Sequence, residues 1–117
     1  MRALIAASEP SLRQGLERLL RRTRPDISPI GVDDLAGLGD DAELAIVAVN
    51  SLDAGDCEPA ERVERVLARV AELQVPVIAL VGWPEDGVER ARAAGARAAL
   101  GMPFEVNELL AAVEAIS

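Results

Sequence analysis

Acidic side chains follow three apolar runs of this sequence, at places where a metal or a phosphoryl group could bind. Glu9, Asp53 and Asp56 come after the first two of these runs, and Glu85 and Asp86 come after the third. A phosphotransfer site with a divalent cation needs several carboxylate oxygens for the metal and a lysine or arginine for the phosphoryl charge. The chain contains no lysine and no histidine. We therefore interpret these acids as solvated loop and capping residues, and we expect no metal site and no cofactor.

Polar and aromatic side chains near the same positions form a candidate ligand crevice, whose residues are Ser8, Glu9, Asn50 and Trp83. Serine and asparagine more often cap helices and turns, and we expect Ser8 to cap a helix whose first turn contains Pro10. Trp83 stands in a loop, where a tryptophan can anchor an interface or cover a pocket. The sequence favours neither role.

Composition limits the class of protein. The 117 residues carry a formal net charge of −8, and 50% of them are hydrophobic with only one tryptophan and one phenylalanine. This length fits one domain over 1–117 with an aliphatic core. The negative charge disfavours nucleic acid and anionic membranes, and no apolar run approaches the ~20 residues of a membrane span. Cys57 is the single cysteine and has acidic neighbours, so we expect an unreactive thiol and a cytoplasmic protein.

Hydrophobic periodicity predicts strands and helices in alternation. The runs 44–49 and 75–81 are continuous and rich in β-branched residues, which is typical of strands buried on both faces. Leucines at helical spacing predict a helix that begins near Pro10 and ends before Pro25. Between 33 and 41 we expect a shortened helix at best. The other expected elements are strands at 4–7, 27–32 and 98–100 and helices at 58–73, 88–94 and 106–116.

This alternation predicts an α/β fold with an open parallel sheet and helices on both faces. Five strands in this length indicate the flavodoxin-like, doubly wound order 2-1-3-4-5. Pro29 lacks an amide hydrogen, which favours an edge position for the strand at 27–32. In such sheets ligands bind at the carboxyl ends of the strands, beside the switch point between the first and third strands. The candidate side chains above are expected to meet there.

Three stretches of the chain resemble the receiver domain of bacterial response regulators. They are the first strand with its turn at 3–12, the fourth strand at Val75–Leu80, and Gly95–Phe104 with the helix that follows. In the last stretch, Gly101-Met102-Pro103-Phe104 is similar to the family's cis-proline turn, where a lysine stands in place of Met102. The resemblance covers nearly the whole chain and implies the receiver fold.

The resemblance also implies that the family's catalytic positions are altered here. The metal-binding acidic pair falls on Ala7 and Ser8. The phospho-accepting aspartate falls on Ala48, or on Asn50 if the alignment shifts by two residues. The switch hydroxyl, the switch aromatic and the lysine fall on Val81, Ala99 and Met102. We expect the flexible Met102 side chain to fill the vacated space and leave the site mostly closed.

These observations predict a non-catalytic pseudo-receiver that acts by protein binding or homodimerisation without phosphorylation, and not an enzyme. The resemblance allows a place at the N-terminal end of a transcriptional response regulator, with no nucleic-acid or membrane binding by this domain itself. A receiver-like domain that senses a small molecule in the crevice is the alternative. The expected interface lies over the helix at 88–94, the strand at 98–100 and the last helix, through Val88, Ala91, Ala98, Ala99, Leu109 and Ala112.

Overall fold

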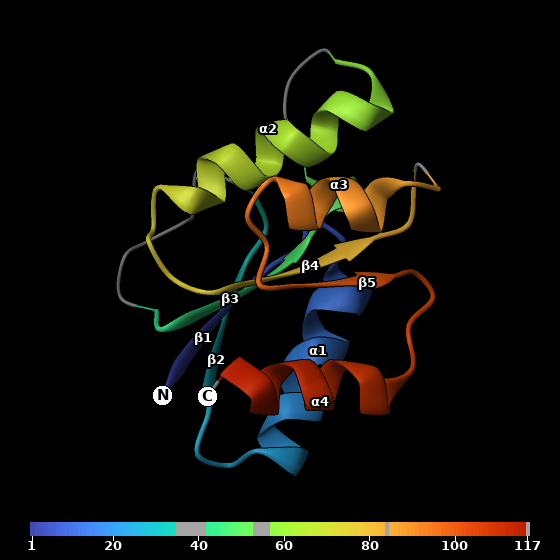
Figure 1. Ribbon diagram of the computed structural model, residues 1–117. Helices are drawn as coiled ribbons and strands as arrows, with labels where there is room; N and C mark the ends of the chain where they lie inside the picture. Colours follow the sequence, from blue (N-terminus) through green and yellow to red (C-terminus); the bar gives the residue numbers. More distant parts are fainter. Residues whose placement is uncertain (35–41, 53–56, 84, 117) are drawn as a thin grey trace.

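The computed structural model describes residues 1–34, 42–52, 57–83 and 85–116, and its strands form one parallel sheet (Figure 1). The sheet order is β2-β1-β3-β4-β5, which confirms the predicted flavodoxin-like order and the edge position of β2. The shortened helix expected between 33 and 41 falls largely outside the described residues. The strands are β1 Arg2–Ala6, β2 Ser28–Val32, β3 Leu44–Ala48, β4 Val77–Val81 and β5 Ala98–Gly101.

Helices cover both faces of the sheet. Figure 1 shows α1 and α4 on one face and α2 and α3 on the other. This division follows from right-handed crossovers, because the chain changes direction across the sheet after β2. A short 3-10 turn, η2 (Val49–Ser51), takes the last residue of the run expected as the third strand. The helices are α1 Pro10–Thr23, α2 Pro59–Ala71, α3 Gly87–Ala93 and α4 Val106–Ile116.

The core has two aliphatic layers, one on each face of the sheet. In β1, Ala3 and Ile5 pack under α1 and α4, while Leu4 and Ala6 pack under α2 and α3. This alternation is the period-2 geometry of a strand that is buried on both faces. Each fully buried aliphatic side chain contributes roughly 1.5–3 kcal/mol relative to exposure. No described helix is long and apolar enough to cross a membrane.

Two helix ends and one turn test local predictions. Helix α1 begins after Glu9, which makes no side-chain capping bond, so the predicted capping role of Ser8 is wrong. Ser8 lies one residue too early, and its hydroxyl donates to the carbonyl of Ser51 in η2 instead. Gly95 follows the end of α3 with φ 109°, the left-handed conformation in which a glycine commonly ends a helix. The peptide bond between Met102 and Pro103 is cis, as the resemblance implied.

Three of the six residues predicted for the interface are buried in the core. Ala91 and Ala99 are buried in the layer under α2 and α3, and Leu109 is buried in the layer under α1 and α4. Helices α3 and α4 lie on opposite faces of the sheet, with β5 at the edge between them (Figure 1). Alanine is small enough for a tight core as well as for a docking face, so its abundance did not distinguish the two. The prediction is wrong for these three residues.

Candidate functional site

The carboxyl ends of the strands border a shallow hollow of about 220 Å³. Parallel register places the ends of β1, β3, β4 and β5 side by side, as in the pairing of Ala48 with Leu80 and of Val81 with Gly101. Ala48, the last residue of β3, is 4% exposed and forms part of the hollow's wall. The lining residues are Glu9, Leu12, Ala48, Asn50, Ser51, Leu80, Gly82 and Met102.

Met102 does not close this hollow, so the prediction of a mostly closed site is wrong. The residue follows β5 and its side chain is among the exposed large apolar ones, at 36%. A Cβ placed on Gly82 would lie 3.4 Å from the Cβ of Met102, so the methionine stands beside the loop after β4. Because the Met102 side chain leaves the edge strand β5 beside this loop, it borders the hollow without filling it.

Asn50 connects the end of β3 to the loop after β4. Its Oδ1 accepts hydrogen bonds from the backbone N–H groups of Gly82 (2.6 Å) and Trp83 (3.3 Å). Its Nδ2 donates to the carbonyl oxygen of Trp83 at 2.6 Å. Two backbone donors on one side require the amide oxygen there, which fixes the orientation of the side chain. The side-chain amide is therefore engaged within the protein at both of its polar atoms.

Ser51 makes a second connection, from η2 to the turn after β1, which the sequence did not predict. Its Oγ accepts from the backbone N–H of Ser8 at 3.1 Å and donates to the carbonyl of Ala48 at 2.8 Å. The guanidinium of Arg13 donates to the carbonyl of Ala7 at 2.8 Å and holds the same turn from α1. The only sequence signal for this connection is a polar pair, Asn50-Ser51, directly after a buried strand. Together with the bonds of Asn50, these bonds connect the ends of β1, β3 and β4.

The other candidate residues that the structure describes do not line the hollow. Trp83 is 58% exposed and is not among the residues that line the hollow, so it does not cover this hollow. Its role as an interface anchor stays a prediction. Asp86 pairs with Arg90 on α3 at 2.8 Å, and Arg90 also reaches Glu64 on α2 at 3.1 Å. Asp53 and Asp56 lie outside the described residues.

Charged groups with shifted pKa values lie away from the hollow. Hydrogen bonds from Arg24 lower the pKa of Asp26, in the loop between α1 and β2 at the opposite edge of the sheet. Hydrogen bonds to Asp86 and then Glu64 raise the pKa of Arg90. In the part of the chain that the structure describes, no three acidic or cysteine side chains gather as metal ligands.

Comparisons with known proteins identify this architecture. No protein-family model matches the sequence, and no curated protein matches it. The structure is similar to a response regulator receiver protein from Burkholderia phymatum, at 26% identity and a TM-score of 0.75, covering 98% of this chain and 93% of that one. A receiver protein from Pseudoalteromonas atlantica matches at 20% identity and a TM-score of 0.74, over 99% of this chain and 96% of that one. The chain has the receiver-domain fold.

A third receiver-fold neighbour carries a longer chain. It is RcsB from Salmonella enterica serovar Typhimurium, bound to the promoter rprA in the presence of a phosphomimetic, BeF3⁻. It matches at 16% identity and a TM-score of 0.76, over all of this chain and 68% of that one. These neighbours are signalling modules of response regulators.

Within the receiver fold, most of the predicted altered positions lie at the carboxyl ends of the strands. Ala7 follows β1, Ala48 and Val81 end β3 and β4, and Met102 follows β5. Ala99 lies apart from them, because its side chain packs in the layer under α2 and α3. The assignment of these residues to the family's catalytic positions stays a prediction.

Proposed function

We propose that this receiver-fold domain acts by binding protein and takes up no phosphoryl group. The observation that carries the proposal is the chemistry of the strand ends. Ala7, Ala48 and Val81 are buried aliphatic residues there, at 0%, 4% and 3% exposure. Phosphoryl uptake on a side chain needs a nucleophilic oxygen, and its metal needs several carboxylate oxygens. Aliphatic side chains have no nucleophilic oxygen and no carboxylate, so they can neither accept a phosphoryl group nor bind its metal.

The hydrogen bonds of Asn50 support a single, constitutive state. A loop that responds to a phosphoryl group needs two arrangements that the group can bias. Here the loop after β4 is held through the backbone of Gly82 and Trp83 by a neutral amide. These bonds require neither a metal nor a phosphoryl group. The surface around Trp83 is therefore presented permanently to a partner.

Acetyl phosphate with Mg²⁺ tests the proposal. The protein is incubated beside a receiver domain that keeps the acidic pair, the aspartate and the lysine, and both are examined by intact mass spectrometry. We expect a mass increase of one phosphoryl group in the control and an unchanged mass here. Stoichiometric phosphorylation of this chain would overturn the proposal.

Sensing of a small molecule is a second candidate because a hollow does exist at the predicted crevice. It has about 220 Å³ and includes Glu9 and Asn50, whereas Ser8 and Trp83 do not line it. This volume is below the roughly 300–1,000 Å³ of typical ligand pockets, and the Asn50 amide already has partners. A screen of metabolites by thermal shift distinguishes the two candidates. A saturable rise in Tm that is lost when Leu80→Phe narrows the hollow would favour sensing.

The partner class also follows from the comparisons as a proposal. RcsB combines this fold with promoter binding in a longer chain, so a DNA-binding effector unit is one partner that such a domain could serve. Homodimerisation stays a prediction, to be checked by sedimentation equilibrium. At the predicted patch only Val88, Ala98 and Ala112 are partly exposed, because Ala91, Ala99 and Leu109 are buried.

A further inference from the structure

The outer edge of β2 has no neighbouring strand in the described part of the chain. β2 lies at one end of the sheet, and among the described strands it pairs with β1 alone (Figure 1). The N–H of Ser28 and the carbonyl of Val32 bond to the residues that flank β1, at 2.8 and 3.1 Å, so alternate residues of β2 face β1. By this alternation, Pro29 and Gly31 turn their backbone groups outward. An edge of this kind can pair with another strand.

The side chains of β2 give this edge one apolar face. Val32 packs against the core layer under α2 and α3. Ile30 points to the same face, because side chains two residues apart in a strand do so. Ile30 is nevertheless 36% exposed and belongs to the exposed large hydrophobic residues. An apolar side chain at a strand edge is covered when a second strand pairs beside it, so the backbone of β2 and Ile30 lack the same neighbour.

On the opposite face of the sheet, charged side chains of α1 cover Gly31. A Cβ at this position would collide with the carboxylate of Glu17 and would lie 3.0 Å from the Cδ of Arg13. Glu17 forms no ion pair with another described residue. The guanidinium of Arg13 donates to the carbonyl of Ala7 at 2.8 Å and has further N–H donors. One carboxylate and one guanidinium therefore lie together at the residue whose backbone faces outward.

We propose that two copies of this chain pair through β2 in antiparallel orientation, with Gly31 opposite Gly31 on a two-fold axis. In this register the two glycines exchange N–H···O=C hydrogen bonds, and each Pro29 carbonyl faces the N–H of Asp33 in the other copy. The two sheets then continue into each other. The proposal rests on the proposed function, since it names a second copy as the protein partner and β2 as the docking edge.

Side chains match on both faces in this register. On the apolar face, Ile30 of each copy lies beside Val32 of the other, as cross-strand neighbours do. On the face covered by α1, Arg13 of each copy meets Glu17 of the other. Opposite charges then alternate around the axis, which favours this pairing over one that brings like charges together.

The glycine favours a second copy over the strand of an unrelated protein. The residue opposite Gly31 directs its side chain toward the face that Glu17 and Arg13 already cover. A second copy places a glycine there, so neither charged side chain is displaced. Pairing centred on Pro29 would form no exchange of hydrogen bonds, because proline has no N–H. Pro29 therefore disfavours that register and leaves the one centred on Gly31.

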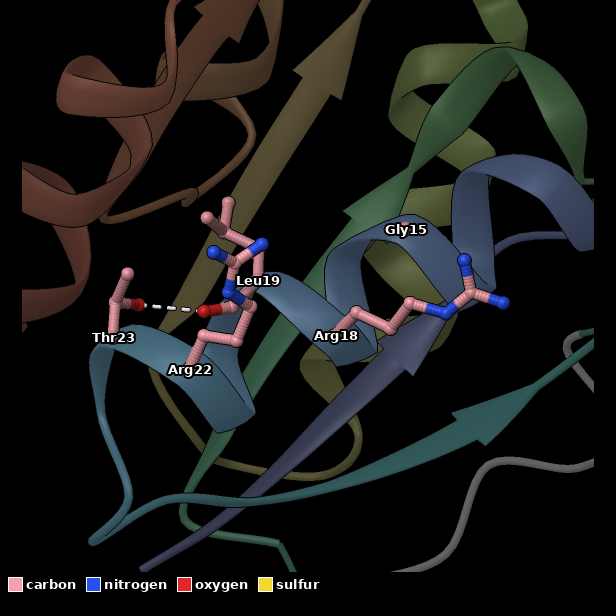
Figure 2. Close-up of a pocket in the computed structure, with 5 residues that line it drawn as sticks. All are labelled: Gly15, Arg18, Leu19, Arg22 and Thr23. Carbon is pink, nitrogen blue, oxygen red and sulfur yellow. Dashed lines mark hydrogen bonds between the residues drawn. The ribbon is translucent and has the colours of Figure 1, made fainter.

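Charge exchange between two variants tests the pairing by sedimentation equilibrium of the whole chain, from micromolar to millimolar concentration. Arg13→Glu and Glu17→Arg each leave only like charges at the axis, so each variant alone should weaken the dimer at least tenfold. An equimolar mixture restores opposite pairs and should form a heterodimer with a Kd within threefold of the parent's. Arg18→Glu, the same charge change at the hollow beside Gly15 (Figure 2), is the matched control and should leave the Kd within twofold.

Two further readouts keep the test decisive if Arg13→Glu unfolds the turn after β1. Ile30→Lys places a charge on an exposed apolar position and should abolish the dimer. Val106→Lys, at the exposed start of α4, is its control and should leave the dimer intact. Amide hydrogen exchange at Gly31 should slow at least tenfold in the dimer, while exchange at Ile30, whose N–H faces β1, stays the same.

A chain that stays monomeric at millimolar concentration would overturn the pairing. The same holds for a dimer that Ile30→Lys leaves intact, for larger oligomers that join β2 to β5, and for a mixture of folded charge variants that does not associate. Binding of an unrelated extended peptide along β2 without self-association would assign the edge to another partner. Phosphorylation by acetyl phosphate would overturn the proposed function and leave this edge unaffected, so the two failures are distinguishable.

Discussion

The hollow at the strand ends and the exposed side of α1 around Gly15, Arg18 and Leu19 both contain apolar side chains, but they differ in whether their polar groups already have partners. At the strand ends, Asn50 and Ser51 are engaged in hydrogen bonds to Gly82, Trp83, Ser8 and Ala48. Along the exposed side of α1, Arg18 and Arg22 make no ion pair within the described residues, and Gly15 faces open space. The first region is completed by the chain itself, whereas the second lacks a contact that another molecule can supply.

This difference indicates which region of a receiver-fold domain with aliphatic strand ends can bind another molecule at the lower energetic cost. Ligand binding at the hollow would have to break hydrogen bonds that the fold already makes, at about 1 kcal/mol each. Binding at the exposed side of α1 would break none of these hydrogen bonds. The four changes below are ordered by the size of their expected effect on the free energy of unfolding.

Ala48→Asp should break the strand-end region most strongly. The new carboxylate would replace a side chain that is 4% exposed, and no cation lines the hollow around it. An uncompensated buried charge costs about 3 kcal/mol or more. Urea unfolding should report a loss of this size, and acetyl phosphate should still fail to label the variant. A variant of unchanged stability would contradict the tight burial of this position.

Asn50→Ala should loosen the same region by a smaller amount. The change removes three hydrogen bonds to the loop after β4, for an expected loss of about 2 kcal/mol. Amide hydrogen exchange at Gly82 and Trp83 should become faster, while exchange in α1 stays the same. Asn107→Ala, an exposed change on α4, is the control and should leave both quantities unaltered. Unchanged exchange at Gly82 would contradict the role given to Asn50.

Gly15→Ala should raise the free energy of unfolding. The added methyl meets open space and replaces a poor helix former, for a gain of about 0.5–1 kcal/mol. Gly95→Ala is the opposite control, because φ at this position is 109° and an L side chain is strained there. Thermal melts should shift up for the first variant and down for the second. A downward shift for Gly15→Ala would mean that the glycine serves the fold itself.

Met102→Lys should have the smallest effect, within about 0.5 kcal/mol of the parent chain. The side chain is 36% exposed, so a lysine amine there can reach water. A lysine at the position where the resemblance predicts one should therefore leave the chemical-denaturation curve nearly unchanged, and we expect no phosphoryl uptake by this variant. A large loss of stability would contradict this expectation and would show that the Met102 side chain is more deeply buried than in the structure.

Local patterning was sufficient to predict the sheet and most helices. Continuous runs such as 44–49 gave the buried strands, and leucines at helical spacing gave α1, because both signals lie within a few residues of each other in the sequence. The edge position of β2 followed from Pro29 and from the doubly wound strand order, which was inferred from the fold class. The apolar runs and the leucine spacing are properties of short segments, so they can be recognised in the sequence without knowing which segments meet in the fold.

The errors lie where distant segments meet. Ser8 was expected to cap its own helix, yet its hydroxyl donates to Ser51, which is 43 residues away. Asn50 reaches Gly82 across 32 residues, and no local pattern shows that contact. Leu109 and Ala91 were grouped in one interface because of residue type, but the two helices that carry them cover opposite faces of the sheet. Composition does not reveal which side of a sheet a helix covers.

Backbone NMR with Mg²⁺ and beryllofluoride, a mimic of the phosphoryl group, tests the central claim most directly. A phosphorylatable site would bind the pair and shift the amide signals of the strand ends and of the loop after β4. We expect unchanged signals for Ala48, Gly82 and Trp83 at saturating concentrations. Saturable shifts centred on these residues would contradict it and would show that the strand ends still recognise a phosphoryl group.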